Sequence, residues 1–255
     1  MNRTVERAFS ILQLIASRKD GITLQEIANE MDIAKSSAFV IVQTLLELNY
    51  ISTVKNNEKK YCLGIEIFSL GMKYLAGTNF VEQCSLVLPK LAEKYNKTAF
   101  VGVLQGTDVV YMYKYVAPNA KLATCELGAR KQAYATSLGK AAIAFLPDSE
   151  RMDIINSIVF EKHTERTIAS KEEFMEEMRK TRERGYSIEK GELEKITSCC
   201  GAPIFDYSGR VVAAVSLSDF YREDEDTNAV AEELKAAAIH VSRLMGYSGD
   251  FISRQ

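Results

Sequence analysis

The stretch TLQEIANEMDIAKSSAFVIVQTLL, residues 23–46, carries two helical patterns separated by a short connection. Thr23 stands three residues before Glu26 and in front of an apolar run, which is typical of a capping box that opens a helix. After the connection MDIAKS, the apolar spacing predicts a second helix over residues 35–48. Two short helices joined in this way indicate a helix-turn-helix unit.

The segments on either side complete a small domain. Apolar residues at helical spacing predict a first helix over residues 4–18, with one buried face formed by Val5, Ala8, Phe9, Leu12, Ile15 and Ala16. Residues 50–64, YISTVKNNEKKYCLG, alternate around a polar turn and predict a hairpin with a Lys-bearing tip. This is the winged helix-turn-helix pattern, in which the helix 35–48 enters the major groove and the hairpin lies beside the DNA backbone. A three-helix bundle without a nucleic-acid role has the same spacing and remains an alternative.

The helix 35–48 has an unusual outer face. Helical spacing assigns its inner face to Ala38, Ile41, Val42, Leu45 and Leu48. On the outer face, serine, threonine and glutamine side chains can bond to phosphates or base edges. Phe39 and Val40 would contact thymine methyl groups, pack on a partner subunit, or simply be tolerated at the surface. Basic residues outside the helix would supply phosphate contacts. The candidate DNA-binding residues are Arg3, Arg7, Thr23, Lys35, Ser36, Ser37, Phe39, Val40, Gln43, Thr44, Lys55, Lys59 and Lys60.

Composition restricts the class of protein. The 255 residues are 47% hydrophobic and 26% charged, which leaves room for two ordinary domains. The net charge of −2 means that any attraction to nucleic acid must be local. The five cysteines include no Cys-x-x-Cys pair, a pattern that argues against a disulfide framework or a zinc site and favours the reducing cytoplasm. We expect no signal peptide, no membrane span, no metal and no cofactor.

The remainder of the chain predicts a mixed sheet with helices on its faces. Residues 64–77 read as a linking helix and residues 80–95 as a longer one interrupted at Pro89. Alternation then predicts strands over 98–104, 108–116 and 121–127, and a strand pair within 198–218 around the turn DYSG. Further helices are expected over 137–146, with Thr136 or Ser137 as N-cap, over 170–185 and over 226–245.

Several motifs resemble one family. TVERAFSILQLIA, GITLQEIANEMDIAKSSAFVIVQTLLELNYI and YCLGIEIFSLG are similar to the DNA-binding domain of IclR-type bacterial transcription regulators, and LGARKQAYATSLGKAAIAFLP, ERGYSIEKGE and GAPIFDYSGRVVAAVSLS resemble their effector-binding domain. The resemblance implies an α/β multi-domain chain. Its parts are a winged helix-turn-helix over 1–63, a linker helix over 64–77 and a GAF/PAS-like α+β domain for effector binding and oligomerisation over 78–255. It also implies homodimers, often paired as homotetramers.

The same resemblance implies a function and a ligand site. The chain would be a DNA-binding regulator whose operator affinity is modulated by a small organic acid or aromatic metabolite. The effector pocket would consist of Gly128, Ala129, Glu189, Cys199, Ser216 and Ser218. Val40 stands where the family usually has arginine, so a small-molecule sensor that acts through protein contacts, with weak or lost DNA binding, is the alternative. An enzyme is not expected, because neither of the two histidines, His163 and His240, follows a nucleophile motif.

Overall fold

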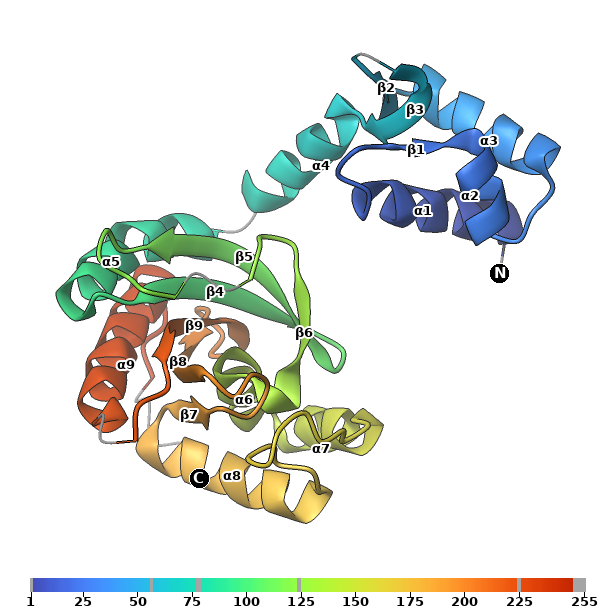
Figure 1. Cartoon of the computed structure of the whole chain (residues 1–255). Helices are drawn as coiled ribbons and strands as arrows, with labels where there is room; N and C mark the ends of the chain where they lie inside the picture. Colours follow the sequence, from blue (N-terminus) through green and yellow to red (C-terminus); the bar gives the residue numbers. More distant parts are fainter. Residues whose placement is uncertain (1, 56, 77–78, 123–124, 224–225, 250–255) are drawn as a thin grey trace. The chain divides into compact units, whose positions relative to one another are not determined.

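Figure 1 shows the computed structural model of the chain, which describes residues 2–55, 57–76, 79–122, 125–223 and 226–249. The chain divides into two compact units, Met1–Gly77 and Thr78–Gln255. None of the helices within the described ranges is long and apolar enough to cross a membrane.

The first unit is a winged helix-turn-helix, as predicted. Its three-stranded antiparallel sheet has the order β1-β3-β2. The predicted capping box is present: the Thr23 hydroxyl accepts from the Glu26 N–H, and the Glu26 carboxylate accepts from the Thr23 N–H. The elements are α1 (Arg3–Ala16), β1 (Ile22–Thr23), α2 (Leu24–Glu30), α3 (Lys35–Glu47), β2 (Ile51–Val54), β3 (Asn57–Leu63) and α4 (Ile65–Ala76).

Two parts of the predicted core of this unit are wrong. On α1 the buried residues are Ile11 and Ile15, whereas Val5 and Phe9 are exposed, Phe9 by 64%. The helix has apolar side chains on two sides, and spacing alone did not separate the side that packs on α3 from the side that faces outward. Leu48 was expected inside but is 55% exposed, because α3 ends at Glu47 and the chain turns away.

The second unit is an α+β domain around one curled antiparallel sheet with strand order β6-β5-β4-β9-β8-β7. The expected mixed sheet is wrong, since every strand pair in the described chain is antiparallel. The elements are α5 (Asn79–Tyr95), β4 (Thr98–Gln105), β5 (Asp108–Val116), β6 (Arg130–Gln132), the 3-10 helix η1 (Ala133–Ala135), α6 (Ser137–Ala144), α7 (Asp148–Ser157), α8 (Lys171–Arg184), β7 (Ser187–Lys190), β8 (Thr197–Phe205), β9 (Val211–Phe220) and α9 (Thr227–Leu244).

Two local predictions in this unit also fail. The segment 121–127 forms no strand where it is described, at residues 121–122 and 125–127, and the short β6 takes the edge beside β5 instead. The segment 121–127 is instead a connection that bonds to the strands at single points. At one of them the Thr98 hydroxyl donates to the Leu122 carbonyl. Pro89 does not interrupt α5, which continues through it.

Helices cover both faces of the sheet and thereby create two cores. Helices α5 and α9 pack on one face, against Ala99, Val101 and Val215 among others. Helices α6, α7 and α8 lie over the other face, where Phe100, Tyr111 and Ala214 point. The alternation of neighbours such as Phe100 and Val101 between the two cores follows from the two-residue period of a strand.

The start of α6 lies directly on the sheet. A Cβ added to Gly201 of β8 would come within 2.5 Å of the Ser137 carbonyl oxygen, so only glycine permits this approach. Of the two predicted N-caps, Thr136 caps the helix, since its hydroxyl accepts from the Gly139 N–H at 3.1 Å. This contact places the N-terminal turn of α6 over the middle of β8 and β9.

Candidate functional site

The outer face of α3 combines polar and apolar side chains. Phe39 and Val40 are exposed, Val40 by 65%, as the helical spacing predicted. The Thr44 hydroxyl donates to the Val40 carbonyl at 2.9 Å, so its proton is already used within the helix. Gln43 is half-buried. The exposed residues of the first turn are Lys35, Ser36 and Ser37.

Helix α3 also begins without a side-chain cap, a feature that sequence reasoning did not use. Its N-cap residue is Ala34, which offers no side-chain acceptor. The first amide groups of a helix have no partner within the helix, and together with the helix dipole they favour a phosphate. The signal was visible in the sequence, because alanine is a poor N-cap residue.

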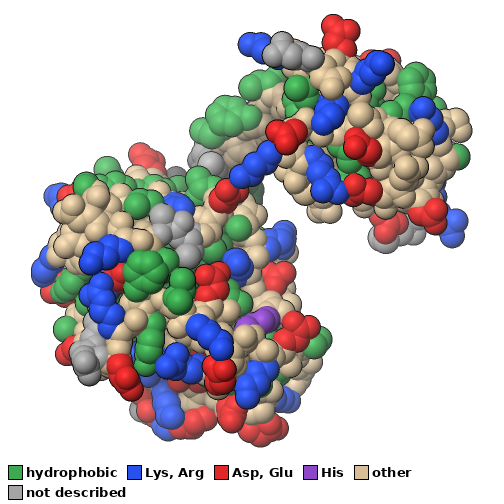
Figure 2. All heavy atoms as spheres, viewed as in Figure 1, with side chains coloured by type: hydrophobic (Ala, Val, Ile, Leu, Met, Phe, Trp, Pro, Cys, Tyr) green, Lys and Arg blue, Asp and Glu red, His purple; other side chains and the backbone are tan. Residues whose placement is uncertain are grey.

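The other DNA-binding candidates differ in how free their side chains are. Arg3, Arg7, Lys55 and Lys59 are exposed. Figure 2 shows Lys and Arg interspersed with Asp and Glu over the visible surface of the first unit, so no broad basic patch forms on that face.

Two candidates near the start of α2 are engaged within the domain. The hydroxyl of Thr23 is occupied in the capping box, where it also donates to the Glu26 carboxylate at 2.7 Å. Lys60 is half-buried on β3, paired with Thr23 of β1. The pKa of Glu26 lies below its usual value, first through the hydrogen bonds from Thr23 and also through the charge of Lys60. The charge of Lys60 is therefore partly compensated.

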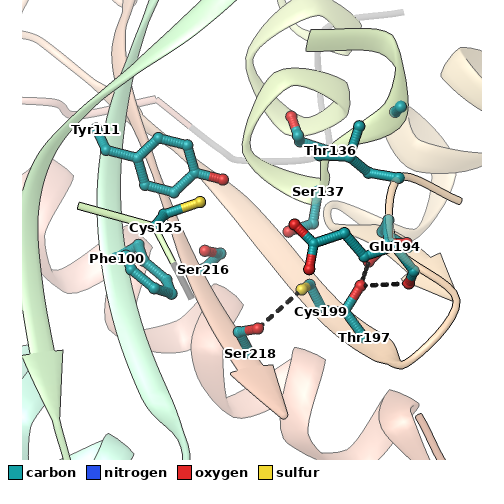
Figure 3. A pocket seen from close by; sticks show the side chains of 13 residues that line it. Phe100, Tyr111, Cys125, Thr136, Ser137, Glu194, Thr197, Cys199, Ser216 and Ser218 are labelled. Carbon is teal, nitrogen blue, oxygen red and sulfur yellow. Dashed lines mark hydrogen bonds between the residues drawn. The ribbon is translucent and has the colours of Figure 1, made fainter. Parts of the chain in front are cut away.

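The second unit contains a pocket between the sheet and the first turn of α6 (Figure 3). Its volume is about 420 Å³ when the space at its mouth, which is open to solvent, is included. The rings of Phe100 and Tyr111 meet edge to face at 5.3 Å on one side. Hydroxyl, thiol and carboxyl groups form most of the remainder. The lining residues are Phe100, Tyr111, Cys125, Ala135, Thr136, Ser137, Glu189, Leu193, Glu194, Thr197, Cys199, Ser216 and Ser218.

Strand register aligns residues from four strands, and three of them, Glu189, Cys199 and Ser218, line this pocket. Glu189 of β7 pairs with Cys199 of β8, Cys199 pairs with Ser218 of β9, and Ser218 pairs with Thr98 of β4. Paired residues point to the same face of a sheet, so the four side chains form one row across four strands. Within the row the Cys199 thiol donates to the Ser218 hydroxyl at 3.1 Å.

A buried group of charges lies beside the pocket. Lys140 of α6 is fully buried, and its ammonium donates to the Glu192 carboxylate and to the Ile188 carbonyl at 3.3 Å. Glu189 is 2% exposed, and its carboxylate accepts from the Glu192 N–H. Burial raises the pKa of Glu189 to about 7. The negative charge of Glu192 also raises this pKa, whereas the positive charge of Lys140 lowers it. Burial also raises the pKa of Glu192.

The loop between β7 and β8 is held in place from outside. The Thr164 hydroxyl donates to the Gly191 carbonyl and the Thr167 hydroxyl to the Glu192 carbonyl, both at 2.6 Å. This loop supplies Leu193 and Glu194 to the pocket wall. Its position therefore depends on two threonines and on the buried pair of Lys140 with Glu192.

The structure brings four of the six expected effector residues together. Glu189, Cys199, Ser216 and Ser218 line the pocket, whereas Gly128 and Ala129 are not among its lining residues. The latter two bond through their backbones to Tyr111, at 2.8 Å and 3.0 Å, and so hold the strand that carries this ring. Sequence reasoning missed Phe100, Tyr111 and Cys125, which look like ordinary core residues in an alternating strand or connection.

The geometry offers little for nucleophilic or metal chemistry. Burial raises the pKa of the Cys199 thiol, which disfavours the reactive thiolate. The His163 ring contacts the Tyr134 hydroxyl at 3.0 Å and the Gln132 side chain. No cluster of three or more potential metal ligands occurs among the described residues.

Comparison with known proteins identifies the family. The family model described as the bacterial transcriptional regulator IclR C-terminal domain matches residues 72–243, and the IclR helix-turn-helix domain matches residues 4–55. The HTH-type transcriptional regulator XynR of Escherichia coli (strain K12) is 29% identical over 247 residues, which cover 96% of this chain and 98% of XynR.

Solved structures have the same fold. The crystal structure of Thermotoga maritima IclR aligns with a TM-score of 0.78 at 27% identity, covering 96% of this chain and 99% of that one. An IclR homolog from Microbacterium hydrocarbonoxydans, complexed with 4-hydroxybenzoate, aligns with a TM-score of 0.79 over 94% of this chain and 99% of that one. Its identity of 16% makes this a likeness of fold alone. With both of its domains matched, the chain belongs to the IclR family of bacterial transcriptional regulators, as a DNA-binding protein with a ligand-binding C-terminal domain.

Proposed function

We propose that this regulator binds operator DNA as a homodimer through the outer face of α3 and the β2–β3 wing, and that an effector in the α6-face pocket changes this binding. The observation that carries the proposal is the uncapped start of α3 beside exposed Ser36 and Ser37. An effector that prefers one arrangement of the dimer shifts the population towards it and thereby alters the spacing of the two α3 helices.

The proposed DNA contacts divide by chemistry. The amides and hydroxyls at the start of α3, with Lys55 and Lys59 of the wing, bind phosphates. Phe39 and Val40 press on thymine methyl groups, which is an apolar form of base readout. Because Thr23 and Thr44 use their hydroxyls internally, we assign them to the support of the helices rather than to DNA contacts.

Exposed apolar side chains support the proposed dimer. Helix α4 exposes Ile65, Phe68, Leu70, Met72 and Tyr74, with Phe68 64% exposed. Apolar side chains on both sides of an otherwise exposed helix are typical of a subunit interface. We also propose that two such dimers pair into a tetramer. A protein with this role acts in the bacterial cytoplasm, where the chromosome lies, and the proposal assigns no reaction to the pocket.

DNA binding is tested with the promoter DNA upstream of the protein's own gene, by fluorescence anisotropy over a series of salt concentrations. Affinity should fall steeply with salt. The Lys59→Ala variant should weaken binding to all sequences alike and reduce the salt slope by about one for each subunit of the dimer. Lys180→Ala, which removes an exposed lysine of α8 in the second unit, is the matched control and should leave both unchanged. If the folded protein does not bind the promoter DNA even at low salt, the result would instead favour a sensor that acts through protein contacts.

The dimer is tested by sedimentation of full-length variants. Phe68→Asp should shift the protein towards monomer, because a carboxylate would replace a ring in the proposed interface. Tyr207→Asp, at an exposed turn between β8 and β9, should sediment as the wild type does. Unchanged sedimentation of Phe68→Asp would remove α4 from the interface.

A further inference from the structure

The charge balance of the pocket is unusual for a site that receives small acids. Two carboxyl groups, Glu189 and Glu194, line it, and no Lys, Arg or His occurs among its described lining residues. The buried ammonium of Lys140 donates to the Glu192 carboxylate, and Lys140 does not line the pocket. Glu194 is paired with the Lys131 ammonium at 3.7 Å. An anionic ligand would therefore chiefly meet the negative charge of the buried Glu189 and would find no cationic side chain among the lining residues.

Other features of the same pocket nevertheless favour an anion. Ser137 opens α6, and the amides of a first helical turn have no acceptor within the helix. Within this turn, the Gly139 N–H already donates to the Thr136 hydroxyl. Opposite the helix start, Ser216 is 3% exposed, lines the pocket and has no side-chain hydrogen bond to another described residue. A hydroxyl that faces a pocket without a protein partner can donate a hydrogen bond to a ligand there.

Glu189 is the group that decides between these two tendencies. The charged and titratable groups around it are Lys140 from α6, Glu192 and Glu194 from the β7–β8 loop, Cys199 from β8 and Tyr111 from β5. One of its oxygens accepts from the Glu192 N–H. The other lies 3.4 Å from the Thr197 hydroxyl and can carry a proton.

Resting on the proposed function, we propose that the pocket takes up a small organic acid together with one proton from the solvent. The effector carboxylate binds at the first turn of α6 and at Ser216. The proton resides on the Glu189 oxygen that faces Thr197, so that Glu189 becomes a neutral hydrogen-bond donor instead of a second negative charge. Glu189 thus makes the response of the regulator to its acid effector depend on pH.

The sign of the pH dependence follows from the state of Glu189. In the free protein its pKa is about 7, and a bound anion nearby raises it further. Below this pKa the pocket is already protonated and binds the acid fully. Above it the fraction of protein with a protonated Glu189 falls as pH rises, so affinity should fall about tenfold from about pH 6 to about pH 8.

The test is calorimetric titration of the full-length protein with 4-hydroxybenzoate, benzoate and pyruvate, each paired with its neutral amide. Near pH 8, in two buffers of different ionisation enthalpy, binding of an acid should take up about one proton per site. Amides should bind, if at all, without proton uptake. Glu189→Gln should bind the acid with no proton uptake and no change of affinity with pH. Glu176→Gln, which removes an exposed carboxyl of α8 outside the pocket, is the control and should keep both the proton uptake and the change of affinity with pH.

Each result decides the proposal. Acid binding without proton uptake overturns it, and so does binding that is confined to the amides or heat from none of the acids. If Glu189→Gln does not fold, the proton count of the wild type decides alone. Binding to promoter DNA is measured separately by anisotropy, so failure of the proposed proton uptake can be told apart from failure of the proposed regulatory function.

Discussion

Glu189 gives the folded protein a pH dependence even without a ligand. Its pKa rises from 4.5 to about 7 on folding, so the folded state holds the proton more tightly than the unfolded chain does. The free energy of unfolding should therefore fall as pH rises from about 4.5 to about 7, by up to about 3 kcal/mol. Glu189→Gln should lack this loss and gain stability over the wild type at pH 8 but not at pH 4. Urea unfolding at both pH values measures it, and equal effects at the two would refute the shifted pKa.

Gly201 is the residue where backbone space matters most. In Gly201→Ala the new methyl group would lie 2.5 Å from the Ser137 carbonyl, so α6 must lift from the sheet. We expect a loss of about 1–3 kcal/mol and weaker effector binding. Gly71→Ala is the matched control, since nothing lies within 4 Å of the new atom and alanine favours a helix interior. Thermal unfolding compares them, and an unchanged midpoint for Gly201→Ala would show that α6 adjusts freely.

At the scale of elements, α2 and α3 begin in opposite ways. Thr23→Ala removes the capping box of α2 and should cost about 1 kcal/mol of stability, with DNA sequence preference unchanged. Ser36→Ala, in the uncapped first turn of α3, should leave stability intact and weaken DNA binding. Denaturant midpoints and anisotropy titrations on the same two variants separate the roles. The reverse pattern would move the DNA contact from α3 to α2.

The elements themselves were largely predictable, because their ends carry local signals. Thr23, Thr136 and Ser170 bond to the first turns of their helices, and Gly185 ends α8 in the left-handed region. Local signals failed where a choice depended on a distant partner. Apolar residues on two sides of α1 could not show which side meets α3.

The pocket was only partly predictable for a related physical reason. Glu189, Cys199, Ser216 and Ser218 were expected from family motifs, and register places all four at the pocket. Phe100 and Tyr111 carry no polar signal that separates them from core residues, and only the path of β4 and β5 past α6 brings them to the site. The cap of α6 was readable, but its approach to Gly201 was not.

At the scale of the whole molecule, each of the two units has a core of its own. Chains of this kind usually do not unfold in a single two-state step. Calorimetry should resolve two transitions. Thr23→Ala should lower only one of them and Gly201→Ala only the other, while a bound acid should raise the second alone. One shared transition that both variants lower equally would mean that the units fold as one.

The row of side chains from Glu189 through Cys199 and Ser218 to Thr98 also has an evolutionary consequence. Glu189, Cys199 and Ser218 supply their side chains to the pocket, while the hydrogen-bond ladder beneath uses only backbone atoms. Point substitutions in the row would let a descendant lineage respond to a new metabolite while keeping its sheet and its DNA-binding unit. Insertion of a single residue within β8 would turn that strand's contribution to the row to the opposite face. The response to the original metabolite would then be lost in one step.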